Sequence, residues 1–186
     1  MTSEKVVSLA AIIISTLALI VSIWQAKDNR DFNKLSIKPH LQVNPKLTGD
    51  KESGLYLENA GTGTAFIDSV TVSTNGKIFN LIEGNPSEFF NSLNVKPDCY
   101  RQSWPKKGAA IQSGKEFPLI KITEANEPLC DFEVFKLLTG PNIIMNISYT
   151  SPYDEKLKYS KRISLTESEL GVDFEIITNA INTLSN

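Results

Sequence analysis

The sequence predicts a mainly β protein in which a single N-terminal transmembrane helix precedes an antiparallel β-sandwich with short helices and a C-terminal helix. Three observations predict this class. An uncharged apolar run lies near the amino terminus, short segments rich in β-branched residues follow it, and turn signals separate these segments. Long helical patterns do not alternate with the strand patterns, which disfavours a doubly wound parallel sheet.

The first element is the apolar run from Val6 to Trp24, which contains no charged residue. A helix needs roughly 20 apolar residues to cross the hydrocarbon core of a bilayer, so this run predicts one membrane span. Trp24 lies where an interfacial aromatic side chain is expected, and Lys27 and Arg30 follow at headgroup level. A cleaved signal peptide is the alternative, but its apolar core is usually only about 7–15 residues long and ends at a small-residue cleavage site. The segment after Ile23 is a poor match to such a site.

The segment after the span predicts how the chain enters its soluble part. Residues 25–35 contain good helix formers without Gly or Pro, and Pro39 disfavours helical geometry at Lys38, so the helix should end by about Ser36. The predicted organisation is an N-terminal tail (1–5), a transmembrane helix (6–24), a juxtamembrane helix and linker (25–38), and a β-sandwich domain (39–186).

Basic residues near the span predict its orientation. Lys5 precedes the span, and four basic residues follow it: Lys27, Arg30, Lys34 and Lys38. The side richer in Lys and Arg normally stays in the cytoplasm. We therefore expect a single-pass membrane protein whose C-terminal domain is cytoplasmic, with a periplasmic domain as the alternative.

The span also carries a stripe of small residues. Five of them recur at spacings of three and four, which places them on one side of a helix: Ser8, Ala11, Ser15, Ala18 and Ser22. Small side chains let two membrane helices approach closely, so this stripe predicts a transmembrane packing face for a second copy or another membrane protein. Chance is the alternative, because Ser and Ala are common in spans and the stronger Gly-x-x-x-Gly pattern does not occur.

The first turn of the soluble part contains the array Gly-Thr-Gly at 61–63, which raises the question of a phosphate-binding loop. A dinucleotide-binding loop requires a third glycine where Phe66 stands, and a P-loop requires a lysine that does not follow. The residues that come next, "AFIDSVTVS", are typical of a strand rather than a helix. We therefore predict two strands joined by a loop in which Gly61 and Gly63 supply positive φ and the Asn59 side chain bonds loop amides.

Further strands follow with their own signals. "HLQV" at 40–43 predicts the first strand, and Asn75–Gly76 is a strong hairpin signal. Pro118 within "KEFPLIKIT" predicts an edge strand. "NIIMNISYT" and "LKYSKRISL" alternate apolar and polar residues and are joined by the turn "SPYDEK", which predicts a hairpin. About seven strands result, the pattern of an immunoglobulin-like sandwich.

Two regions are less regular. Residues 84–114 form a long polar segment that contains the short helix pattern "PSEFFNSL", and long loops on a rigid scaffold often carry binding sites. "EPLCDFEVFKLLTG" predicts a second short helix that ends at Gly140 and Pro141. Apolar residues at helical spacing over 173–184 predict the C-terminal helix.

The stretch around the end of the span and the glycine turn resembles a group of uncharacterised bacterial single-span membrane proteins. Their pattern has a Leu-Ser-Val-x-Pro-x-Leu segment after the span and a Leu-x-Asn-x-Gly-x-Gly-Pro-Ala hairpin. This chain matches at Asn33, Leu35, Ser36, Pro39, Leu41, Leu57, Asn59, Gly61, Gly63 and Ala65, and it departs at Phe32 and Thr64. The resemblance covers roughly residues 15–72 and implies a bacterial inner-membrane protein with a small β-rich domain. It implies no activity.

Composition excludes several function classes. The formal net charge of −2 gives no field that would attract nucleic acid. His40 is the only histidine and stands at the entry to the first predicted strand, so catalysis by a nucleophile and a histidine base is not expected. Cys99 and Cys130 lack metal-ligand spacing, and we favour free or buried thiols, although an oxidising compartment would let them pair. We predict no catalytic residues, no bound metal and no cofactor.

One stretch has a composition suited to binding. "CYRQSWPKKG" combines cations and aromatic side chains, which gives a candidate binding loop of five residues: Tyr100, Arg101, Trp104, Lys106 and Lys107. Its three charges are too few for an electrostatic footprint on nucleic acid, and a solvated loop with a buried aromatic is the favoured interpretation.

These observations predict a protein that is not an enzyme: a membrane-anchored interaction domain, an accessory or regulatory subunit of a bacterial membrane assembly. The alternative is a membrane-tethered sensor that binds a small ligand or lipid headgroup through the 84–114 loop.

Overall fold

The computed structural model describes residues 3–46, 53–95, 99–122, 137 and 142–163. The chain divides into two compact units, Met1–Lys38 and Pro39–Asn186. The helix patterns predicted at 127–140 and 173–184 lie outside the described residues, apart from Leu137.

The first unit is the long helix α1, Ser3–Ser36, in which no residue is buried. Its end agrees with the prediction from Pro39, and the amide of Ile37 donates the last hydrogen bond to the Asn33 carbonyl at 3.2 Å. Its most apolar window has a mean hydropathy of 2.7, which is long and apolar enough for a membrane span, although a signal sequence would have the same property. A buried core helix is a poor alternative, because no residue of α1 is buried.

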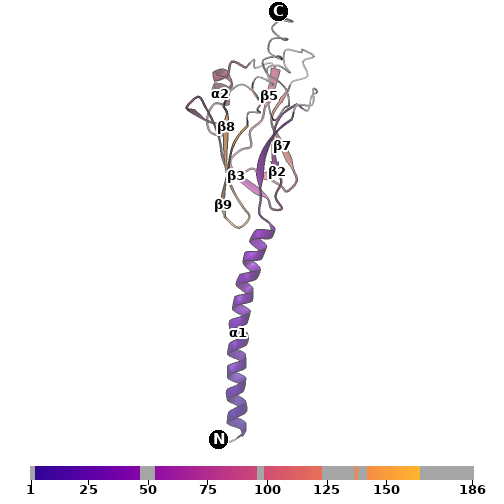
Figure 1. The fold of residues 1–186 in the computed structure, drawn as a ribbon, viewed down its shortest axis with the longest axis vertical. Helices are drawn as coiled ribbons and strands as arrows, with labels where there is room; N and C mark the ends of the chain where they lie inside the picture. Colours follow the sequence, from indigo (N-terminus) through magenta and orange to yellow (C-terminus); the bar gives the residue numbers. More distant parts are fainter. Residues whose placement is uncertain (1–2, 47–52, 96–98, 123–136, 138–141, 164–186) are drawn as a thin grey trace, which may run out of the picture. The chain divides into compact units, whose positions relative to one another are not determined.

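The second unit contains two antiparallel sheets (Figure 1). The first sheet has the strand order β1-β2-β7-β5, formed by Leu41–Lys46, Gly54–Asn59, Glu116–Ile122 and Tyr100–Gln102. The second has the order β4-β3-β8-β9, formed by Lys77–Asn80, Ala65–Thr74, Ile144–Thr150 and Lys156–Arg162, with β6 (Ala110–Ile111) on the start of β3. The helix α2, Pro86–Ser92, follows β4 and begins at the cap Asn85, whose side chain accepts from the Ser87 amide at 3.1 Å.

Alternation of side chains along the strands produces one core shared by both sheets. Val70 and Val72 of β3 and Met145 and Ile147 of β8 are buried, while the residues between them are only partly covered. The first sheet contributes Leu41, Val43, Leu55, Leu57, Leu119 and Ile120 to the same cluster. Phe89 and Phe90 of α2 add two of the largest fully buried side chains. Burial of these apolar side chains is the main stabilising term for the unit.

Turn chemistry was predicted well at both hairpins. Asn75 and Gly76 connect β3 to β4 with φ of 50° and 76°, the two positive values that a two-residue turn of type I′ requires. The turn between β8 and β9 has Asp154 at φ 60°, and the Asp154 amide donates to the Ser151 carbonyl at 3.0 Å. The described chain has nine strands instead of about seven, because β5 and β6 are short pairings within the segment predicted to be irregular.

The edge position predicted from Pro118 is wrong. The strand β7 lies between β2 and β5 and is therefore an inner strand. Its register against β2 shifts by one residue, so that Tyr56 pairs with Pro118 and Leu55 pairs with Ile120. Pro118 sits at this irregularity, and β5 pairs only with residues 120–122. A proline is tolerated there because the bulge interrupts the ladder that would have used its amide.

Candidate interaction surfaces

The glycine turn is organised by the side chain of Asn59, which has no exposed surface. Its Oδ1 accepts from the amides of His40 and Gly61, both at 3.1 Å. Its Nδ2 donates to the carbonyls of Gly63 at 2.7 Å and Ile111 at 2.9 Å. The amide group thus uses both acceptor sites and both donors, and it ties the start of β1 and the strand β6 to the turn.

The predicted role of Asn59 is therefore confirmed, and the predicted role of the two glycines is wrong. Among the described glycines, positive φ values occur at Gly54, Gly76, Gly108 and Gly114, and not in the Gly-Thr-Gly array. The turn is held by the side-chain hydrogen bonds of Asn59 instead of by left-handed backbone geometry. The backbone carbonyls of the turn are occupied as well, since Ser113 donates its hydroxyl to the Gly61 carbonyl at 2.7 Å.

His40 contributes to this turn through its backbone. Its amide donates to Asn59, and its carbonyl accepts from the Ala60 amide at 2.9 Å. The imidazole itself is exposed. Among the described residues, no group of three or more His, Cys, Asp or Glu side chains is arranged to hold a metal ion.

The candidate binding loop splits into inward and outward residues. Tyr100 is buried and stacks on Phe90 with ring centroids 4.4 Å apart, and this burial raises the pKa of the Tyr100 hydroxyl. Trp104 packs against the core and donates its indole N–H to Gln102 at 2.9 Å. Lys107 lies 3.8 Å from the Glu83 carboxylate on the surface. The aromatic and cationic side chains that the sequence suggested would act together therefore point into different environments.

Lys106 and Arg101 complete that loop and are exposed. With the aromatic side chains turned inward, the outward part of the loop consists of separated charges without an aromatic platform. This arrangement matches the solvated loop that was the favoured interpretation, and it offers little for recognition of a ring or base.

Cys99, at the start of the same loop, is disulfide-bonded and 4% exposed. The sequence holds two cysteines, so Cys130, which lies outside the described residues, is the available partner within the chain. The favoured expectation of a thiol at Cys99 is therefore wrong. No spacing rule could have decided this, because pairing depends on which loops the fold brings together.

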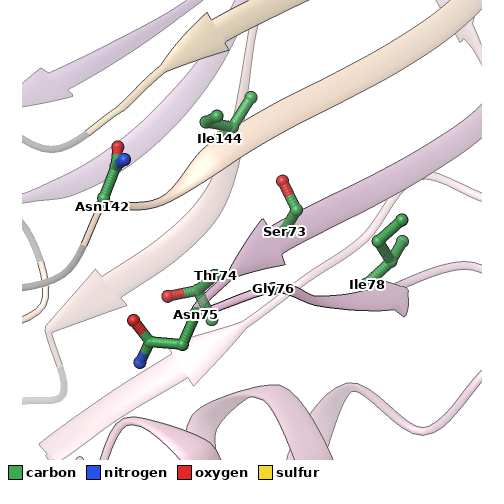
Figure 2. A pocket seen from close by; sticks show the side chains of 7 residues that line it. All are labelled: Ser73, Thr74, Asn75, Gly76, Ile78, Asn142 and Ile144. Atoms are coloured by element: carbon green, nitrogen blue, oxygen red, sulfur yellow. The ribbon is translucent and has the colours of Figure 1, made fainter.

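A shallow hollow of about 440 Å³ lies at the β3–β4 hairpin, and sequence analysis did not predict it. Figure 2 shows Ser73 between the side chains of Ile78 and Ile144, and Asn142 and Asn75 also line the hollow. The two isoleucines are exposed, Ile78 to 76%. Thr74 also lines the hollow, and its buried hydroxyl is without a hydrogen-bond partner in the described chain.

The small residues of α1 form the other candidate surface. The hydroxyls of Ser8, Ser15 and Ser22 donate to carbonyls of their own helix, to Glu4, Ile12 and Ala18, at 2.8–2.9 Å. Each hydroxyl is therefore satisfied without leaving the helix, and the stripe that also includes Ala11 and Ala18 presents small side chains with no unpaired polar group. Such a face allows close helix approach without a desolvation cost.

Comparisons with known proteins bring no family to this chain: no family model, no curated protein and no solved structure matches it.

Proposed function

We propose that the protein is not an enzyme but a membrane-anchored interaction protein, an accessory or regulatory subunit of a bacterial membrane assembly. The finer architecture belongs to the same proposal: the two sheets form an immunoglobulin-like sandwich, a common scaffold for binding domains. The observation that carries the proposal is the small-residue stripe of α1, on a helix in which no side chain is buried.

The physical argument starts from the bilayer. Lipid tails compete equally for every apolar surface of α1, so hydrophobicity alone gives the helix no reason to associate. Close packing of small residues is the attraction that remains. Because the stripe's hydroxyls are already bonded within the helix, a partner helix meets a compact surface. A second copy and a different membrane protein fit this face equally well.

The sensor hypothesis is the second candidate, and the loop geometry weakens it. Tyr100 and Trp104 pack toward the core, so the described part of residues 84–114 lacks a concave aromatic site. The hollow beside Ser73 lies elsewhere and has few convergent polar groups. Binding through a protein surface is the better-supported role.

A membrane two-hybrid assay tests the proposal. Ala11→Ile and Ala18→Ile keep the helix apolar, so insertion should be unchanged, while the larger side chains hold two helices apart and association should fall sharply. Ile13→Leu and Leu17→Ile are matched changes off the stripe and should have little effect. Equal effects of both pairs, or no association of the parent helix, would show that the small residues are only composition.

We further infer that the β domain lies outside the cytoplasm. Disulfides persist in oxidising compartments and are rare in the cytosol, so the bond at Cys99 supports this orientation over the cytoplasmic one that Lys27, Arg30, Lys34 and Lys38 predict. A reporter that is active only outside the cytoplasm, fused after Asn186, should be active. The cytoplasmic orientation would be supported instead by a silent reporter together with alkylation of Cys99 when cells are lysed under denaturing conditions, because alkylation requires a free thiol.

A further inference from the structure

The strand β9 forms one edge of the second sheet, and its backbone has a defined open side. Two hydrogen bonds at the ends of the β8–β9 ladder fix the alternation: Ile163 N–H to the Ile143 carbonyl at 2.9 Å, and Ser151 N–H to the Glu155 carbonyl at 3.0 Å. Odd-numbered residues of β9 therefore bond to β8. The N–H and C=O groups of the even-numbered residues Lys156, Lys158 and Ser160 point away from β8.

The other edges are shorter or already blocked. On the outer side of β1, the Val43 amide donates to the Tyr159 hydroxyl at 3.3 Å, and Pro45 has no amide hydrogen. The edge strands β5 and β4 have only three and four residues. Within the part of the chain that the structure describes, β9 is thus the longest edge, with seven residues and no strand paired on its outer side.

The charge of this edge is strongly one-sided. Four of its seven residues are basic and exposed, and no residue of the strand is acidic: Lys156, Lys158, Lys161 and Arg162. On the neighbouring strand β8, Thr150 pairs with Lys156, and the Thr150 hydroxyl donates to the Asp68 carboxylate at 2.7 Å. Asp154 and Glu155 lie in the preceding turn. Among the described residues, the ion pairs Lys46–Glu116 and Lys107–Glu83 do not involve the lysines of β9.

We propose that β9 binds an extended acidic segment of a partner protein, which adds to the second sheet as a further strand. Main-chain hydrogen bonds to the open N–H and C=O groups supply affinity, and alternate side chains supply specificity. Lys156 and Lys158 lie on one face, about 6.6–6.8 Å apart along the strand. Acidic residues at alternate positions of an added strand have the same spacing, so each carboxylate faces a lysine as a cross-strand pair.

Edge lysines also have a protective role in many sheets, because they discourage unwanted strand pairing. The two roles differ in what they predict. If the lysines only discourage pairing, an acidic peptide is attracted by their charge alone and forms no hydrogen bonds with the backbone of β9. A binding edge requires both the lysines and the open amides, and these two requirements can be removed separately.

The experiment uses the full chain in nanodiscs of uncharged lipid and a labelled peptide, acetyl-Glu-Thr-Glu-Val-Glu-Thr-Glu-amide. Fluorescence anisotropy measures its binding, and hydrogen exchange measures protection of the Lys158 and Ser160 amides. Ser160→Pro removes one open amide without using the β8 ladder and should weaken binding about tenfold or more. Ser160→Ala keeps that amide and loses only the hydroxyl bond to Asn146, so it should bind like the parent.

Charge is tested in the same assay. Lys156→Glu with Lys158→Glu should weaken binding by a similar factor, whereas Lys77→Glu on the opposite edge strand should change it less than about twofold. The peptide with its threonines replaced by proline keeps its charge and cannot pair as a strand, so it should not bind. Thermal unfolding of each variant shows that the fold is retained.

Three outcomes would overturn the inference. One is no binding of the acidic peptide by the parent chain, which includes the case in which another part of the chain covers β9. Equal binding by Ser160→Pro and Ser160→Ala would show charge attraction alone. Binding to vesicles containing phosphatidylserine that needs the lysines but not the Ser160 amide would assign the edge to a lipid surface. The inference deepens the proposed interaction role but uses a different surface, so its failure leaves the two-hybrid result on α1 untouched.

Discussion

Asn59→Ala tests whether one side chain holds the glycine turn and the adjoining strand ends. The substitution removes four hydrogen bonds, to His40, Gly61, Gly63 and Ile111, in a site without exposed surface. A typical hydrogen bond contributes about 1 kcal/mol net, so the expected loss in the free energy of unfolding is about 4 kcal/mol. This is a large fraction of the roughly 5–15 kcal/mol that stabilises most domains.

The loss should appear as a lower Tm. A loss of 1 kcal/mol lowers Tm by about 2–4 °C in a domain of this size, so Asn59→Ala should lower it by about 8–16 °C. The assay is thermal unfolding of the full chain in detergent micelles, followed by near-ultraviolet circular dichroism of the tyrosines, because α1 contains no tyrosine. Asn44→Ala is the matched control, because the Asn44 side chain makes one bond, to Glu58 at 2.7 Å, on the partly covered surface of β1.

Asn59→Asp sharpens the test. It keeps the shape and the two acceptor bonds, but a carboxylate oxygen replaces the amide nitrogen opposite the carbonyls of Gly63 and Ile111. Repulsion between these buried oxygens should make Asn59→Asp at least as unstable as Asn59→Ala at neutral pH. The reasoning is refuted if Asn59→Ala costs no more than Asn44→Ala, since the four bonds would then contribute nothing beyond an exposed pair.

Three further predictions follow from single contacts. Gly54→Ala should lower the free energy of unfolding by at least about 1–3 kcal/mol, because its methyl group would overlap the Ile120 carbonyl oxygen. Urea titration measures this loss, and an unchanged midpoint would contradict it. The Gly61 amide donates to the Asn59 side chain and is not available to a phosphate, so the chain should show no nucleotide binding that Gly63→Ala abolishes. Burial raises the pKa of Tyr159, and the hydrogen bond from the Val43 amide partly offsets this rise. The neutral phenol therefore stabilises the folded state below about pH 10, and this stability is lost as the pH rises through the pKa of the folded state. Tyr159→Phe should therefore flatten the fall in Tm above pH 10 and cost about 1 kcal/mol at neutral pH, where Val43 loses its acceptor.

Local chemistry explains which parts of the fold could be predicted. The hairpin at Asn75–Gly76 follows from two residues that tolerate positive φ, and the alternation along β8 follows from the period of a strand with one covered face. The end of α1 follows from Pro39, which excludes helical geometry at the preceding residue. In each case, the determining residues are neighbours in the sequence.

The remaining features depend on residues far apart in the chain. Pro118 looked like an edge residue because the register shift that accommodates it is set by β2, and β5 and β6 are too short to show any period. The hydroxyl of Tyr159 covers the amide of Val43, 116 residues earlier, and no local pattern of either strand contains that contact. The disulfide at Cys99 and the hollow beside Ser73 depend on loop packing in the same way.

Asn59 belongs to both groups, because two of its hydrogen bonds lie within the turn and two reach distant segments of the chain. The turn from Asn59 to Gly63 is local, so an asparagine followed by Gly-x-Gly predicts a side chain that bonds the turn. The bonds to His40 and Ile111 are not local, and they connect the residue before β1 with the short strand β6 on the second sheet. A residue that satisfies four groups from three segments leaves few alternatives, because any replacement leaves buried donors or acceptors unpaired. The Leu-x-Asn-x-Gly-x-Gly pattern thus has a structural cause in this chain, and it carries no requirement for a phosphate ligand.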